Sequence, residues 1–360
     1  MSAAAKHVKS SSLVERIADA VLYEGYILYP YRPSAVKNQQ RWNFGVLCPE
    51  SFATAQRGTE SSTMRTECLV ESNSSTTLAV KVRFLHLMQR ELAQLFNDCS
   101  APGCEHLVDQ SGRHFRLQPS LEVNGEVLQA WQEAIAREVV VPQIRISQLE
   151  SPLCRKFVFP ASRMTEALTD NASGAMTGML VRTQRDVVCE VEISAQQVEQ
   201  SLKLSIVIRN LSAFADARDR SRDDALMHST VSTHTILELE EGSFISLLDP
   251  PASQKAAASA CINTGTYPVL VGDEGNRNCM LSSPIILYDY PQIAPESAGN
   301  LFDGTEIDEI LTLRIMSLTD DEKREMRSAD ELARQLLERT ESMSAEQLLN
   351  LHGVMKKVES

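Results

Sequence analysis

The sequence predicts an α+β protein with a mainly antiparallel, sandwich-like β body and a C-terminal bundle of short helices. Short segments that alternate apolar and polar residues recur through the first 290 residues, turn-forming residues separate them, and helical spacing takes over after residue 301. This order lacks the regular alternation of strands and helices that indicates a parallel sheet. We expect a disordered N-terminus at 1–12, an α+β domain at 13–150, a β-sandwich-like domain at 151–300 and a helical tail at 301–360.

The first expected domain opens with a helix at 13–22, where apolar residues recur at helical spacing. Two strands are expected at 66–70 and 78–84, with the polar segment ESNSSTT as the turn between them. The second strand alternates apolar residues with Lys81 and Arg83, which predicts one buried face.

Two further elements are expected before residue 150. Residues 126–136 predict a short helix that carries Trp131. Residues 138–146 are rich in valine and isoleucine, but Pro142 lacks the N–H that a central strand donates to its neighbour. This segment is therefore predicted to be an edge strand.

The second expected domain contains the clearest strands of the chain. At 187–193 and 202–208, apolar residues alternate with polar ones across the connection AQQVEQ. This pattern is typical of an antiparallel pair with one buried face. Further strands are predicted at 155–159, 179–183, 235–240, 244–248, 267–271 and 285–288.

The tail from residue 301 predicts short amphipathic helices. Three capping boxes pair Thr319 with Glu322, Ser328 with Glu331, and Ser344 with Gln347. Such pairs satisfy the backbone N–H groups at the start of a helix. Helices this short are unstable alone in water, so their apolar faces are expected to pack on the body of the same chain, with a partner as the alternative.

Composition and charge exclude several classes of protein. The chain carries 35 Lys and Arg against 48 Asp and Glu, a net charge of −13, which disfavours nucleic acid and anionic membrane surfaces as partners. An apolar run long enough to span a membrane is missing, and the first 20 residues do not resemble a secretory signal. The eight cysteines are widely spaced without a C-x-x-C pair, which predicts reduced thiols in a cytoplasmic protein. No pattern indicates a bound cofactor.

An aromatic and basic segment at 23–44 is the strongest local candidate for a binding surface. Four of the seven tyrosines and one of the two tryptophans fall within it. Tyrosine, tryptophan and arginine are enriched among the residues that dominate protein interfaces. The alternative is that these rings fill the core of a β domain. The candidate partner-binding residues are Tyr23, Tyr26, Tyr29, Tyr31, Arg32, Lys37, Arg41 and Trp42.

Two weaker patterns concern metal binding. Cys99, Cys104, His106 and His114 form a C-x4-C-x-H-x7-H spacing that offers the thiolate and imidazole ligands of zinc. This spacing departs from the usual short C-x2-4-C pair, so ordinary loop cysteines and surface histidines are the alternative.

The second metal pattern joins two histidines to downstream cysteines. His228 and His234 precede Cys261 and Cys279 in the sequence. Along a strand, six residues separate two side chains by about 20 Å, so only a turn would bring the histidines together. Packing within a hydroxyl-rich strand is the alternative.

Common catalytic signatures are missing from the sequence. It contains no phosphate-binding G-x-x-x-x-G-K-[ST], no dinucleotide-binding G-x-G-x-x-G after a strand, no H-E-x-x-H and no G-x-S-x-G. An enzyme remains an open alternative, because many active sites are assembled from distant residues.

Four segments point together to a known family. They are LYEGYILYPYRPSAVKNQQRWNFG (22–45), STHTILELEEGSFISLLDPP (232–251), LSSPIILYDYPQIAPESAGNLFDGTEIDEILTLRIMSLTDDEKREMR (281–327) and EQLLNLHG (346–353). In these segments the chain resembles a bacterial protein family associated with gene clusters for nickel–iron hydrogenases, particularly of the high-affinity, actinobacterial type. The resemblance covers about 13–355 and is most specific at 281–327.

The resemblance implies a role in hydrogenase assembly or function and carries over no catalytic residue. We therefore expect a non-catalytic accessory or assembly protein whose partner is a hydrogenase subunit or a maturation factor. Two alternatives remain: a metal-handling protein that binds nickel or zinc through cysteine and histidine, and an enzyme with a dispersed site.

Overall fold

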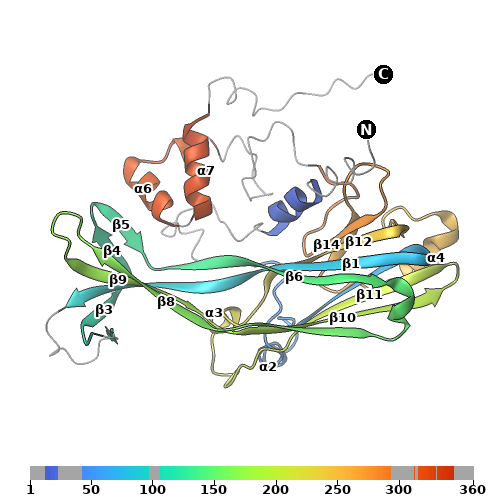
Figure 1. The fold of residues 1–360 in the computed structure, drawn as a ribbon, viewed down its shortest axis with the longest axis horizontal. Helices are drawn as coiled ribbons and strands as arrows, with labels where there is room; N and C mark the ends of the chain where they lie inside the picture. Colours follow the sequence, from blue (N-terminus) through green and yellow to red (C-terminus); the bar gives the residue numbers. More distant parts are fainter. Residues whose placement is uncertain are drawn as a thin grey trace.

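The computed structural model describes residues 13–22, 43–96, 106–109, 111–292, 312, 315–329 and 331–343. Within these residues the chain is mainly antiparallel β sheet, with one twelve-stranded sheet and a separate two-stranded hairpin (Figure 1). The strands are β1 (Thr63–Phe96), β2 (His106–Val108), β3 (His114–Gln118), β4 (Ser120–Val123), β5 (Glu126–Gln129), β6 (Trp131–Arg145), β7 (Leu153–Phe159), β8 (Ser162–Thr169), β9 (Met176–Gln184), β10 (Val187–Val198), β11 (Ser201–Asn210), β12 (Val231–Ile245), β13 (Tyr267–Leu270) and β14 (Cys279–Ser283).

Short helices complete the described structure. They are α2 (Glu50–Ala55), η2 (Ile146–Glu150), α3 (Arg222–Leu226), η3 (Ala252–Gln254), α4 (Lys255–Ser259), α6 (Asp320–Ala329) and α7 (Glu331–Glu341). Residues 13–22 are helical as predicted. Among the residues described, no helix is both long and apolar enough to cross a membrane.

Strand β1 organises the sheet because it is 34 residues long and pairs with β3, β6, β9, β11 and β12. At about 3.3 Å per residue, such a strand runs along the length of the body, as Figure 1 shows. It therefore joins strands from both of the ranges that the sequence suggested as separate domains.

The expected turn between 66–70 and 78–84 is wrong, because both segments belong to β1. The residues on either side of ESNSSTT pair with the same strand, β12, and only the register shifts between Ser72 and Thr77. The Thr76 hydroxyl donates to the Glu241 carbonyl oxygen across this shift. Pairing with β12 thus keeps this polar segment within β1. The expected strands at 235–240 and 244–248 are likewise one strand, β12.

The helix expected at 126–136 is also wrong, because this segment holds β5 and the start of β6. Asn124 and Gly125 both adopt positive φ, at 54° and 82°, between β4 and β5. An Asn-Gly pair in this conformation makes a tight hairpin turn that matches strand twist. The pair was visible in the sequence and outweighs the helical spacing that follows it.

Other predicted strands are confirmed. β10 and β11 form the predicted antiparallel pair, and β6 pairs only with β1 among the described strands, as Pro142 predicted for an edge strand. The strand expected at 285–288 is wrong; β14 ends at Ser283, just before Pro284.

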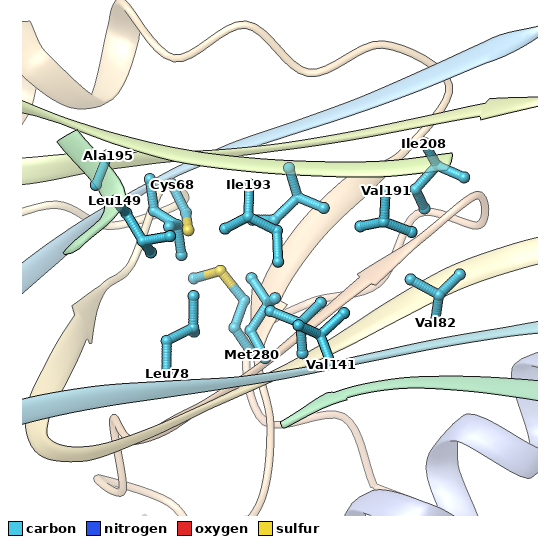
Figure 2. Packing of buried hydrophobic residues seen from close by; sticks show 14 of the residues in the cluster. Cys68, Leu78, Val82, Val141, Leu149, Val191, Ile193, Ala195, Ile208 and Met280 are labelled. Carbon is cyan, nitrogen blue, oxygen red and sulfur yellow. The ribbon is translucent and has the colours of Figure 1, made fainter. Parts of the chain in front are cut away.

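The main core lies between two parts of the folded sheet. Val191 and Ile193 of β10 and Ile208 of β11 share one buried cluster with Val82 of β1 and Val141 of β6 (Figure 2). The figure shows these side chains pointing toward one another from strands above and below them. The apolar residues that alternate along these strands therefore form the two surfaces of the sheet that pack against each other.

The C-terminal helices pack on the body of the same chain, as predicted. Leu336 and Leu337 of α7 are buried in a cluster with Leu85 and Leu87 of β1. The first predicted capping box is confirmed: the Thr319 N–H donates to the Glu322 carboxylate at 2.8 Å, and the Glu322 N–H donates to the Thr319 hydroxyl at 3.3 Å. The side chains of the other two boxes lie outside the described residues.

Candidate functional site

The eight residues predicted to bind a partner all lie at 23–42, outside the described residues. The structure does place the residues on either side of this segment on the body. Leu22 is buried in the cluster that includes α7 and β1. Leu47 donates its N–H to the Thr230 carbonyl oxygen at 2.9 Å. The binding role of the aromatic and basic segment stays a prediction.

The first metal pattern is only partly described. Cys99 and Cys104 lie outside the described residues, and only the backbone of His106 is described, in β2. His114 begins β3, where its ring centroid lies 6.1 Å from that of Phe96. In the described part of the chain, no three His, Cys, Asp or Glu side chains gather as metal ligands do. The loop zinc site stays a prediction.

The two histidines of the second pattern have different surroundings. His234 is fully buried in β12, and its Nδ1 lies 2.9 Å from the Ser232 carbonyl oxygen. Burial lowers the pKa of His234 to about 4. His228 is half-buried, and its Nδ1 lies 3.7 Å from the Asp186 carboxylate. The hydroxyl-rich strand packing considered as the alternative fits His234 better than a metal site.

A cleft of about 960 Å³ opens where β8, β9 and the segment 213–228 meet. Three arginines line it, namely Arg163, Arg185 and Arg220. Phe214 and Met227 contribute apolar surface to the same cleft. The cleft therefore combines positive charge with an apolar wall on a chain whose net charge is −13.

Beneath the cleft lies a cluster of buried polar groups. Gln184 is 2% exposed, and its Oε1 accepts a hydrogen bond from Nη2 of Arg137 at 2.9 Å. His86 is fully buried, and its Nε2 lies 2.9 Å from the Arg185 carbonyl oxygen. Burial lowers the pKa of His86 to about 4, so this ring is neutral at pH 7. Among the described residues, neither Nε2 of Gln184 nor Nδ1 of His86 has a hydrogen-bond partner.

An open edge of the sheet runs from this cleft along β7 and β8. Within the described residues, β7 pairs only with β10, and β8 pairs only with β9, so the other side of each strand carries unpaired backbone groups. Pro160 and Ala161 connect the two strands. Val158 and Met164 are 61% and 53% exposed along this edge.

Comparison with known proteins does not change this description. No family model matches the chain, and no curated protein matches it. The candidate sites therefore rest on the geometry of the described residues.

Sequence reasoning did not find the cleft or the open edge. Arg220 belongs to a segment, ADARDRSRDDA at 215–225, that reads only as a charged surface loop. Arg163 and Gln184 lie on strands whose pairing places Ser162 opposite Gln184. One signal for the edge was present in the sequence. Pro160 lies between β7 and β8, and proline is typical of the border of a sheet because it lacks the N–H that a central strand donates.

Proposed function

We propose that this protein is a non-catalytic accessory or assembly protein for a nickel–iron hydrogenase, and that it acts in the cytoplasm through protein–protein contacts. The resemblance of four sequence segments supplies the hydrogenase context. The structural observation that supports a contact role is the open edge of β7 and β8. We further propose that the body is sandwich-like and that the short C-terminal helices form a bundle on it.

The open edge has the properties of a surface that accepts another chain. An extended segment can add to an unpaired strand through backbone hydrogen bonds. Arg155, Lys156 and Arg163 are exposed on β7 and β8, and the first acidic residue after Leu153 is Glu166. This positive edge favours an acidic extended segment of a partner, because opposite charges speed encounter and fix orientation.

Charged residues on an edge also prevent unwanted pairing. Lysine and arginine on an edge strand discourage two copies from pairing edge to edge, because their like charges would meet. The edge of β7 and β8 therefore disfavours self-association and leaves the strand available to an acidic partner. The exposed Val158 and Met164 give that partner apolar contacts.

Co-purification with a tagged hydrogenase large subunit tests this proposal. We expect this protein to be enriched with the tagged subunit or with a maturation factor, relative to an untagged strain. Eluting at 0.5 M salt would weaken the interaction if the positive edge contributes, since salt screens exposed charges. No enrichment of this protein with any hydrogenase or maturation component would overturn the proposal.

A further inference from the structure

We propose that the cleft between β8, β9 and the segment 213–228 binds an organic anion, a small molecule with an apolar body and a carboxylate or phosphate group. This inference goes beyond the proposed accessory role and does not depend on a hydrogenase partner. It rests on the charge of the cleft, on a buried hydrogen-bond donor beneath it and on its apolar wall.

In the described chain the arginines of the cleft form no short ion pair, although Arg220 and Arg185 act on Asp224 at longer range: hydrogen bonds with Ser221, followed by the charges of these two arginines, lower the pKa of that carboxyl. Within the described chain, Arg163, Arg185 and Arg220 form no ion pair within 4 Å, although 20 such pairs are found elsewhere in that part. Of the two acidic residues that line the cleft, Asp224 is committed to the capping box of α3. Guanidinium groups bind carboxylate and phosphate oxygens through paired N–H donors.

A buried amide adds a donor that charge alone would not supply. Arg137 has only donors, so the oxygen of Gln184 must face it and the amide nitrogen must face away. That nitrogen has no acceptor among the described residues, and Gln184 lines the cleft. A buried donor without an acceptor is unfavourable, so a ligand oxygen that accepts a hydrogen bond from it would stabilise the complex.

The wall of the cleft favours a ligand with an apolar body over a simple inorganic ion. Leu107, Leu117, Phe214 and Met227 all line it. The Phe214 ring is held edge-on between Phe52 and His228, with ring centroids 5.9 Å and 5.5 Å away. A fixed aromatic wall beside arginines is typical of pockets in which apolar contact gives affinity and a few polar groups give orientation.

Isothermal titration calorimetry with three small probes tests this inference. Phenyl phosphate and benzoate carry the two possible anionic groups on the same ring, and benzamide is the neutral control. We expect one or both anions to bind at least tenfold more tightly than benzamide. Tighter binding of phenyl phosphate would assign a phosphate ligand, and tighter binding of benzoate a carboxylate ligand. Equal binding of all three, or binding of none, would overturn the inference.

A pair of matched variants places the anion in this cleft. Arg185→Gln together with Arg220→Gln should weaken binding of the preferred anion at least tenfold. Arg218→Gln, an exposed substitution on the same loop that does not line this cleft, should change it less than twofold. Thermal unfolding of each variant reports whether the fold is kept. Unchanged anion binding in a folded double variant would overturn the assignment of the site.

Discussion

At the residue scale, two buried histidines make the stability of this protein depend on pH. His234 and His86 are fully buried, and burial lowers the pKa of each to about 4. In the unfolded chain both would titrate near 6.5. Between these values the unfolded state binds more protons than the folded state, so stability falls as the pH drops from about 6.5 to about 4.

This difference in pKa predicts that the free energy of unfolding changes measurably with pH. Urea unfolding should show that the free energy of unfolding falls by up to about 3 kcal/mol per histidine between pH 7 and pH 4. His234→Asn keeps a donor for the Ser232 carbonyl oxygen but cannot titrate. Its stability should therefore fall less steeply than that of the wild type, and equal slopes for the two proteins would contradict this account.

The cysteines give a second prediction at this scale. Among the six described cysteines only Cys154 is exposed, and burial raises the pKa of Cys48 to about 11 and that of Cys189 to about 12. A thiol reacts as its thiolate, so the buried thiols should be unreactive in the folded protein. Brief iodoacetamide treatment followed by peptide mapping should label Cys154 well before Cys189. Comparable labelling of both without denaturant would show that β10 opens readily.

At the scale of elements, local patterns predicted those parts that depend on neighbours in sequence. The β10–β11 pair, the helix at 13–22, the capping box at Thr319 and the edge position of β6 all follow from short-range signals. The unbroken course of β1 does not, because ESNSSTT is kept extended by β12, about 165 residues further along the chain. Pairing between distant segments overrides local turn propensity.

The tail helices offer a test at this scale. Leu337 of α7 is fully buried against β1, so Leu337→Asp would place a carboxylate in an apolar contact and release the helices. We expect a loss of about 3 kcal/mol or more and faster amide hydrogen exchange in α7. Glu338→Gln, an exposed neighbour, should leave exchange unchanged. Equal protection in both variants would show that α7 does not depend on this contact.

At the scale of the whole molecule, the sheet places segments together that are far apart in sequence. The cleft draws Arg163 from β8, Gln184 from β9 and Phe214 and Arg220 from the loop before α3. No spacing motif can signal such a site, because its residues are brought together only by strand pairing. The positive edge was only partly visible in the sequence: Pro160 marks the break between β7 and β8, but which strands remain unpaired at the border of the sheet depends on pairing between distant segments.

The charges on β7 and β8 differ in sign from the net charge of the chain. The chain is acidic as a whole, but β7 and β8, which leave backbone groups unpaired, carry Arg155, Lys156 and Arg163 against one acidic residue, Glu166. Strand addition by an acidic segment would satisfy the backbone and the charges together. We therefore infer that the protein contacts its partner at this edge.

The direct test is binding of purified variants to the hydrogenase subunit or maturation factor that co-purifies with the protein, measured by biolayer interferometry. Val158→Glu together with Met164→Glu makes the edge acidic, and Val140→Glu is the matched control on β6, the exposed edge strand elsewhere in the sheet. We expect the double variant to bind at least tenfold more weakly than the wild type, whereas the control stays within twofold. Wild-type affinity in the double variant would show that the partner does not bind at this edge.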